Sequence, residues 1–360
     1  MSAGARTPWW TWAWPGLAWA TMIATAMTGA AGVVAVAAGA VLIATVFAAV
    51  YHAEVVAHRI GEPFGTLVLA VAVTVIEVAL IVSIMVGVAA DKAGLARDTV
   101  FAAVMIVCNG IVGLCLLAGG ARHREQGFQL QGASAALAVL AALTILTLVV
   151  PNVTTSTPGP TFSTSQLVFA GVVSLVLYGS FVFVQTVRHR DYFLPLEAGS
   201  EEVHAPPPSN HAALVSSALL LVALVAIVGL AKALTPAVES TIGWFGAPKA
   251  VVGIAIAMVV LLPEGLAALR AARANRLQTS LNLALGSALA TIGLTIPAVA
   301  IVSIVLGQRL ELGLGAKEMT LLALTLLVGV ITLGTGRTTV LQGIVHLVIF
   351  ATFLFLAVVP

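Results

Sequence analysis

Two glutamates stand alone in long apolar stretches of this sequence. Glu77 lies in the middle of residues 64–90, which contain no other charged side chain, and Glu264 directly follows Pro263 within residues 247–269. If these stretches cross a bilayer, an ionised carboxylate at mid-depth costs at least ~2.5–3.5 kcal/mol. Such a residue is expected to face an internal cavity, bind a cation or stay protonated. Two of them suit a hard cation such as Ca²⁺, which takes about 6–8 oxygen ligands.

The same two acids also predict proton chemistry. When the cation leaves, mutual repulsion and burial favour protonation of both carboxylates, so cation and proton binding exclude each other. Alternating access to this pair would exchange a cation for protons. Two alternatives stay open: Glu77 as a protonated acid bonded across helices, and Glu264 as the ion-pair partner of Arg270. Pro263 removes a donor and is predicted to kink or open its helix, releasing backbone carbonyls for an ion.

Polar residues in neighbouring apolar stretches are candidates to complete the site. Asn109 lies mid-span, and the pair Gly286 and Ser287 offers a side-chain oxygen and a close backbone approach. A Gly-Ser pair is also a common helix-packing device, which is the alternative reading. The residues predicted to gate the site or line its vestibule are Glu54, His58, Glu62, Glu239 and Pro263. His52, His58 and His346 could relay protons, or could be ordinary interfacial histidines.

The composition explains why these few polar residues are informative. The chain has 360 residues, of which 60% are hydrophobic and 8% charged, and its mean hydropathy is +1.12. Soluble domains carry roughly 25% charged residues, so a soluble globular protein is excluded. The net charge of +2 excludes a nucleic-acid partner. No nucleotide-binding loop, zinc-ligand cluster or nucleophile elbow is present, so neither ATP, nor a cofactor, nor an enzymatic activity is expected.

The apolar stretches predict an all-α polytopic membrane protein with about eleven transmembrane helices. About 20 apolar residues are needed to cross the hydrocarbon core. The predicted spans are residues 10–28, 33–57, 64–90, 98–119, 133–150, 166–187, 212–233, 247–269, 278–306, 318–335 and 339–358.

A repeated motif predicts that the chain consists of two repeats. Glu54 precedes Gly61 and Pro63 at the same spacing at which Glu239 precedes Gly246 and Pro248, and each motif introduces an acid-bearing helix. Five helices per repeat insert in opposite directions, a common design of secondary transporters. The predicted parts are an extra N-terminal helix in 1–30, repeats in 31–187 and 212–360, and a cytoplasmic polar linker in 188–211. More Lys and Arg residues lie on one side of the spans, which predicts a cytoplasmic N-terminus.

Four segments resemble a known family. Residues 50–81, 178–193, 261–297 and 336–350 are similar to bacterial ChaA-type calcium/proton antiporters of the calcium:cation antiporter superfamily. The resemblance implies a bacterial inner-membrane location and eleven helices. It also implies that Glu77 and Glu264 are the essential acids, and it matches Asn109, Gly286 and Ser287 to residues of the family's two repeats.

The acids themselves depart from the family pattern. The Gly-Asn-Ala-x-Glu motif of the wider cation/proton exchangers is replaced by Val73-Thr74-Val75-Ile76-Glu77 and by Val260-Leu261-Leu262-Pro263-Glu264. Fewer side-chain oxygens weaken the case for strict Ca²⁺ selectivity, and the ChaA-type branch is also associated with Na⁺ and K⁺.

The predicted function is therefore secondary active exchange of cytoplasmic Ca²⁺ for external H⁺, with Na⁺ or K⁺ as further substrates. The alternative is a cation channel that uses the same acids as a selectivity site. The expected partners are inorganic cations and the lipid bilayer, and the sequence is also compatible with a homo-oligomer.

Overall fold

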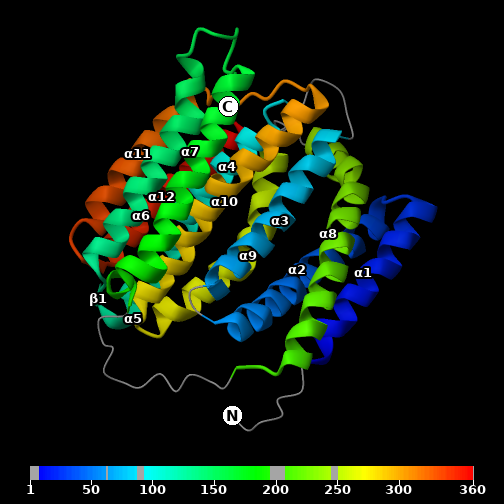
Figure 1. Ribbon diagram of the computed structural model, residues 1–360, viewed down its shortest axis with the longest axis horizontal. Coiled ribbons are helices and arrows are strands. Elements are labelled where there is room, and N and C mark those ends of the chain that lie inside the picture. Colours follow the sequence, from blue (N-terminus) through cyan, green and yellow to red (C-terminus); the bar gives the residue numbers. More distant parts are fainter. Residues whose placement is uncertain (1–7, 62–63, 87–92, 195–206, 245–249, 360) are drawn as a thin grey trace. The chain divides into compact units, whose positions relative to one another are not determined.

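The predicted apolar spans form helices throughout the part of the chain that the structure describes. The computed structural model describes residues 8–61, 64–86, 93–194, 207–244 and 250–359 (Figure 1). Within them, eleven helical rods follow the order and nearly the boundaries of the eleven predicted spans. Nine of these rods are long and apolar enough to cross a membrane. A helix satisfies its backbone polar groups internally, which is required in lipid.

The helices divide into two compact units, each of which combines segments from both halves of the sequence. The first unit comprises residues 1–87 and 200–246, and the second comprises residues 88–199 and 247–360. The first unit therefore takes one helix from the predicted second repeat. The assignment of two inverted repeats stays a prediction.

Four helices make up the first unit. Its helix α2 contacts each of the other three, and α8 also packs against α1 and α3. A proline lies inside α8 at Pro236, and the helix continues past the predicted end of its span. The bounds are α1 (Trp9–Thr28), α2 (Gly32–Ile60), α3 (Phe64–Val86) and α8 (Asn210–Trp244).

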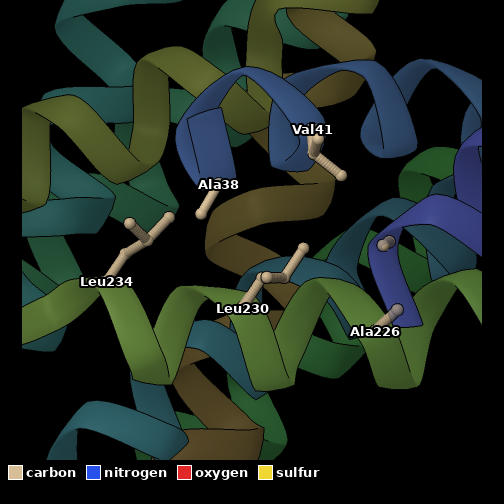
Figure 2. Close-up of a cluster of buried hydrophobic side chains, with 6 residues drawn as sticks. Ala38, Val41, Ala226, Leu230 and Leu234 are labelled. Atoms are coloured by element: carbon tan, nitrogen blue, oxygen red, sulfur yellow. The ribbon is translucent and has the colours of Figure 1, made fainter. Parts of the chain in front are cut away.

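A small apolar cluster joins α2 to α8 in this unit. Figure 2 shows Ala38 and Val41 of α2 facing Leu230 and Leu234 of α8. Small alanines at such contacts let two helix backbones approach closely, which is how apolar helices associate in lipid. The cluster therefore fixes the two longest helices of the unit against each other.

The second unit is built around one buried rod that runs from Leu95 to His123. This rod consists of α4 (Leu95–Met105), a π-helical segment η2 (Ile106–Ile111) and α5 (Val112–His123). Of its most apolar 18-residue window, 89% is buried, against 28–61% for the windows of the unit's other spans. It is therefore the central helix of the unit.

The other helices of the second unit surround this rod. Helices α9, α10, α11 and α12 contact it directly, and α6 and α7 pack against α10. Two further segments of the outer rods are π-helical, η3 (Ile145–Val149) and η5 (Val184–Arg188), and two short 3₁₀ turns follow them, η4 (Val150–Asn152) and η6 (Arg190–Phe193). The helices are α6 (Leu130–Thr144), α7 (Thr164–Phe183), α9 (Ala250–Arg273), α10 (Leu277–Leu306), α11 (Ala316–Leu333) and α12 (Val340–Val358).

A small two-stranded sheet, which was not predicted from the sequence, joins two loops of this unit. Strand β1 (Glu125–Gly127) pairs antiparallel with β2 (Arg337–Thr339), and Gln126 lies opposite Thr338. Strand β1 follows α5 directly, and β2 directly precedes α12. The sheet therefore ties the end of the central rod to the start of α12.

Candidate cation site

Glu77 lies in the interior of its unit. It is in the middle of α3, and only 2% of its surface is exposed. Thr74, one turn earlier on the same helix, is also buried, with 5% exposed. Helix α3 packs against α2 and α8. Glu77 is therefore buried in the middle of an apolar helix, as the sequence predicted.

Glu264 is half-buried on α9, which packs closely on the central rod of the second unit. A Cβ built on Gly265 would lie 3.1 Å from Cδ1 of Ile111, the last residue of the π-helical segment. Of the two outcomes predicted for Pro263, a kink or an opening, the opening is wrong, because α9 is continuous from Ala250 to Arg273. Neighbouring helices hold the chain helical on both sides of a proline that lacks only one donor.

Asn109 lies in the π-helical segment at the centre of the buried rod and is fully buried. The N–H of Val112 bonds the carbonyl of Val107, five residues back, which is the wider π-helical turn. Single π-helical turns inside α-helices frequently occur at functional sites. Asn109 therefore combines a buried polar side chain with an irregular backbone.

The Asn109 amide is held by side chains from two other helices. Its Nδ2 donates to Oγ1 of Thr325 on α11 at 2.9 Å, and its Oδ1 lies 3.0 Å from Nδ1 of His346 on α12. Nε2 of His346 lies 3.1 Å from Oγ1 of Thr332, also on α11. All four side chains are at least 97% buried. We call Asn109, Thr325, Thr332 and His346 the amide network.

Gly286 and Ser287 lie on α10 and are half-buried. Among the described residues, no atom outside the local helix lies within 4 Å of a Cβ built on Gly286. Both readings of the Gly-Ser pair, a part of the site and a helix-packing device, therefore stay predictions.

The predicted vestibule residues are described only in part. Glu54 and His58 are exposed near the end of α2, which stops at Gly61 with a positive φ of 77°. Glu62 lies outside the described residues, and Glu239 falls in α8 at a position whose side chain is not described.

His52, another candidate proton relay, is fully buried. Its Nε2 lies 3.0 Å from the carbonyl oxygen of Thr11 on α1. This contact ties α2 to α1. A structural role therefore accounts for His52.

The second unit thus brings Asn109 together with His346 and places the helix of Glu264 against the same π-helical segment. Glu77 belongs to the first unit. Sequence reasoning missed Thr325 and Thr332. The available signal was their spacing of seven residues, which puts two hydroxyls on one face of the otherwise apolar residues 321–333.

Comparison with known proteins identifies a family. A family model described as "sodium/calcium exchanger protein" matches residues 18–187 and 215–359. The chain is 52% identical over 363 residues to a putative ionic transporter, y4hA, of Sinorhizobium fredii, covering 99% of this chain and 98% of that protein. It is 37% identical over 317 residues to the sodium-potassium/proton antiporter ChaA of Escherichia coli, covering 87% of this chain and 85% of that protein.

The fold is also known from solved structures. The crystal structure of the selenium-substituted Ca²⁺/H⁺ antiporter protein YfkE superposes with a TM-score of 0.72 at 17% identity, covering 98% of both chains. At this identity the likeness concerns the fold alone, and it agrees with the predicted architecture of a multi-pass helical membrane protein.

Proposed function

Because this multi-pass membrane chain belongs to the sodium/calcium exchanger protein family, whose members are transporters and not enzymes, we propose that it exchanges inorganic cations for protons. Two relatives support proton coupling: one is named a sodium-potassium/proton antiporter and one a Ca²⁺/H⁺ antiporter. The observation that carries the mechanism is the position of Glu77. It is a nearly inaccessible carboxylate in the middle of an apolar helix, where an ion must be bound or a proton taken up.

The proposed mechanism uses one acid from each predicted repeat. Glu77 and Glu264 bind the cation together, and protons replace it at the same oxygens when it leaves. Because inverted repeats place equivalent acids at one depth, alternating access to them couples the two fluxes. Asn109, Gly286 and Ser287 contribute to the same site, and Glu54, His58, Glu62, Glu239 and Pro263 line or gate its approach.

The substrates proposed are Ca²⁺, Na⁺ and K⁺. Within one turn of Glu264, the neighbouring side chains from Val260 to Ala268 carry no oxygen, and Thr74 is the one hydroxyl beside Glu77. Ca²⁺ requires about 6–8 oxygen ligands, so side chains on these two helices supply few of them. This composition favours a site that accepts monovalent cations as well as Ca²⁺.

The test is cation-driven proton movement in everted membrane vesicles, followed with a pH-sensitive dye while Ca²⁺, Na⁺ and K⁺ salts are added in turn. Glu77→Gln and Glu264→Gln are each expected to abolish the signal, since glutamine cannot exchange a proton. Glu125→Gln is the matched control, because that glutamate is half-exposed and pairs with Arg337 at 3.4 Å on the surface. Exchange that persists in Glu77→Gln would reject the mechanism, and cation flux without proton movement would favour a channel.

A further inference from the structure

The hydrogen bonds of the amide network have a defined direction. The Thr325 hydroxyl donates to the carbonyl of Leu321 at 2.8 Å, so its oxygen accepts from Nδ2 of Asn109. This orientation directs Oδ1 of Asn109 toward His346. Nδ1 of His346 must then carry the hydrogen and donate it, which leaves Nε2 to accept from the hydroxyl of Thr332 in the neutral ring.

Close packing between α5 and α12 maintains this geometry. A Cβ built on Gly113 would lie 3.1 Å from Cβ of His346, and a Cβ built on Gly343 would lie 2.5 Å from the backbone nitrogen of Leu117. The two helices therefore approach closely at His346 and again at Gly343, one turn earlier. The contact leaves His346 little freedom to move away from Asn109.

The bond from His346 limits what the Asn109 oxygen can offer an ion. An amide oxygen has two lone pairs, and in this structure His346 occupies one of them. The positive end of the N–H dipole also lies beside the oxygen that would bind a cation. Both effects weaken the oxygen as a ligand, and the electrostatic effect is larger for a divalent than for a monovalent cation.

We propose that His346 is a positioning residue that fixes the Asn109 amide and competes with the transported cation for Oδ1, which lowers the preference of the site for divalent cations. The proposal rests on the proposed function, in which Asn109 contributes to the cation site. It assigns to His346 the role of a hydrogen-bond donor. A proton carried by this histidine is not required.

The experiment compares His346→Leu with His346→Asn in the everted-vesicle assay, with Ca²⁺ or Na⁺ as the added cation. Leucine removes the donor, whereas the amide nitrogen of asparagine can replace Nδ1. In His346→Leu the KM for Ca²⁺ is expected to fall about five-fold, the typical effect of one neutral hydrogen bond, and the KM for Na⁺ to fall less. The maximal rate for Ca²⁺ is expected to fall as well, because release slows.

The controls separate this role from a merely structural one. His346→Asn is expected to restore the wild-type KM values. His189→Leu is the matched control and is expected to leave the KM values unchanged. The ring of His189 is exposed and stacks on Tyr192, with 4.9 Å between the two ring centroids. An unchanged or raised KM for Ca²⁺ in His346→Leu, or equal behaviour of the leucine and asparagine variants, would overturn the proposal.

A measurement that does not depend on transport covers the case in which His346→Leu fails to fold. Nitrogen-15 NMR of histidine-labelled wild-type protein in lipid is expected to show one neutral ring with the hydrogen on Nδ1 that is absent from His346→Asn. The opposite tautomer or a doubly protonated ring would overturn the proposal. If wild-type vesicles exchange no cation for protons, the proposed function itself fails; if they do and only the His346 expectations fail, this inference alone is wrong.

Discussion

Nδ1 of His346 lies 3.0 Å from Oδ1 of Asn109, although the two residues are 237 positions apart in the sequence. The contact joins the last helix of the chain to the π-helical segment of the central rod. Both side chains are almost completely inaccessible, so their hydrogen bonds are with protein groups and not with water. A buried polar network of this kind is rigid when every member is satisfied and unstable when one partner is lost.

Thr325→Val is expected to destabilise the protein. Valine keeps the shape of the side chain but leaves Nδ2 of Asn109 without its 2.9 Å acceptor, which costs about 1–3 kcal/mol for a buried donor. Thermal unfolding in detergent measures the loss as a lower Tm. Thr320→Val on the same helix is the control, because its hydroxyl bonds only the Ala316 carbonyl on an exposed face. Equal Tm values for the two variants would argue against a structural role of the network.

Gly343→Ala is expected to lower the Tm as well, for a steric reason. The added Cβ would lie 2.5 Å from the nitrogen of Leu117 and 2.9 Å from the carbonyl oxygen of Gly113, so α5 and α12 must separate. Overpacking of this kind typically costs about 1–3 kcal/mol. By contrast, among the described residues no atom outside the local helix lies within 4 Å of a Cβ built on Gly179 of α7, so Gly179→Ala should be neutral or stabilising. The prediction fails if both alanine variants unfold at the wild-type temperature.

Gln126→Leu is expected to loosen the turn between α9 and α10. Nε2 of Gln126 donates to the Ala272 carbonyl and to Oδ1 of Asn275, each at 2.9 Å, and Asn275 has a positive φ of 60°. Hydrogen–deuterium exchange should show faster exchange in residues 270–278 of the variant. Residues 316–333 of α11 serve as the internal reference. Unchanged protection of the turn would contradict the expectation.

Lower pH on the side from which the cation binds should raise the apparent KM for the cation and leave the maximal rate unchanged. The sign follows from the proposed mechanism: protonated Glu77 and Glu264 cannot bind a cation, so protons act as competitive inhibitors. Initial rates in vesicles at several external pH values and cation concentrations give both parameters. A fall in the maximal rate at constant KM would instead indicate a proton site separate from the cation site.

The two ends of the chain are expected on opposite sides of the membrane. Eleven spans are an odd number, and the Lys and Arg distribution predicts a cytoplasmic N-terminus. Reporter proteins that are active on only one side, fused separately to each terminus, measure this directly. Activity of the cytoplasmic reporter at the C-terminus would contradict the predicted orientation.

The sequence by itself determined the helices. Hydrocarbon thickness sets the minimum length of an apolar run, and charged or glycine-containing segments end it, so the order and approximate ends of the helices follow from hydropathy alone. Gly61, whose φ is +77°, ends α2 three residues after the predicted end of that span. Glu77 could be recognised for the same reason, because a single carboxylate in the middle of an apolar run is evident from the sequence alone.

Only the tertiary structure decided which helix faces meet. Helix α10 carries small polar residues on several of its faces, so its sequence does not show which neighbour each face will contact. The contacts of Asn109 with Thr325 and His346 and the pairing of β1 with β2 therefore could not be derived from the hydropathy pattern. Packing can also override a local signal: α9, which packs on the central rod, stays continuous at Pro263, where the sequence predicted a kink or an opening.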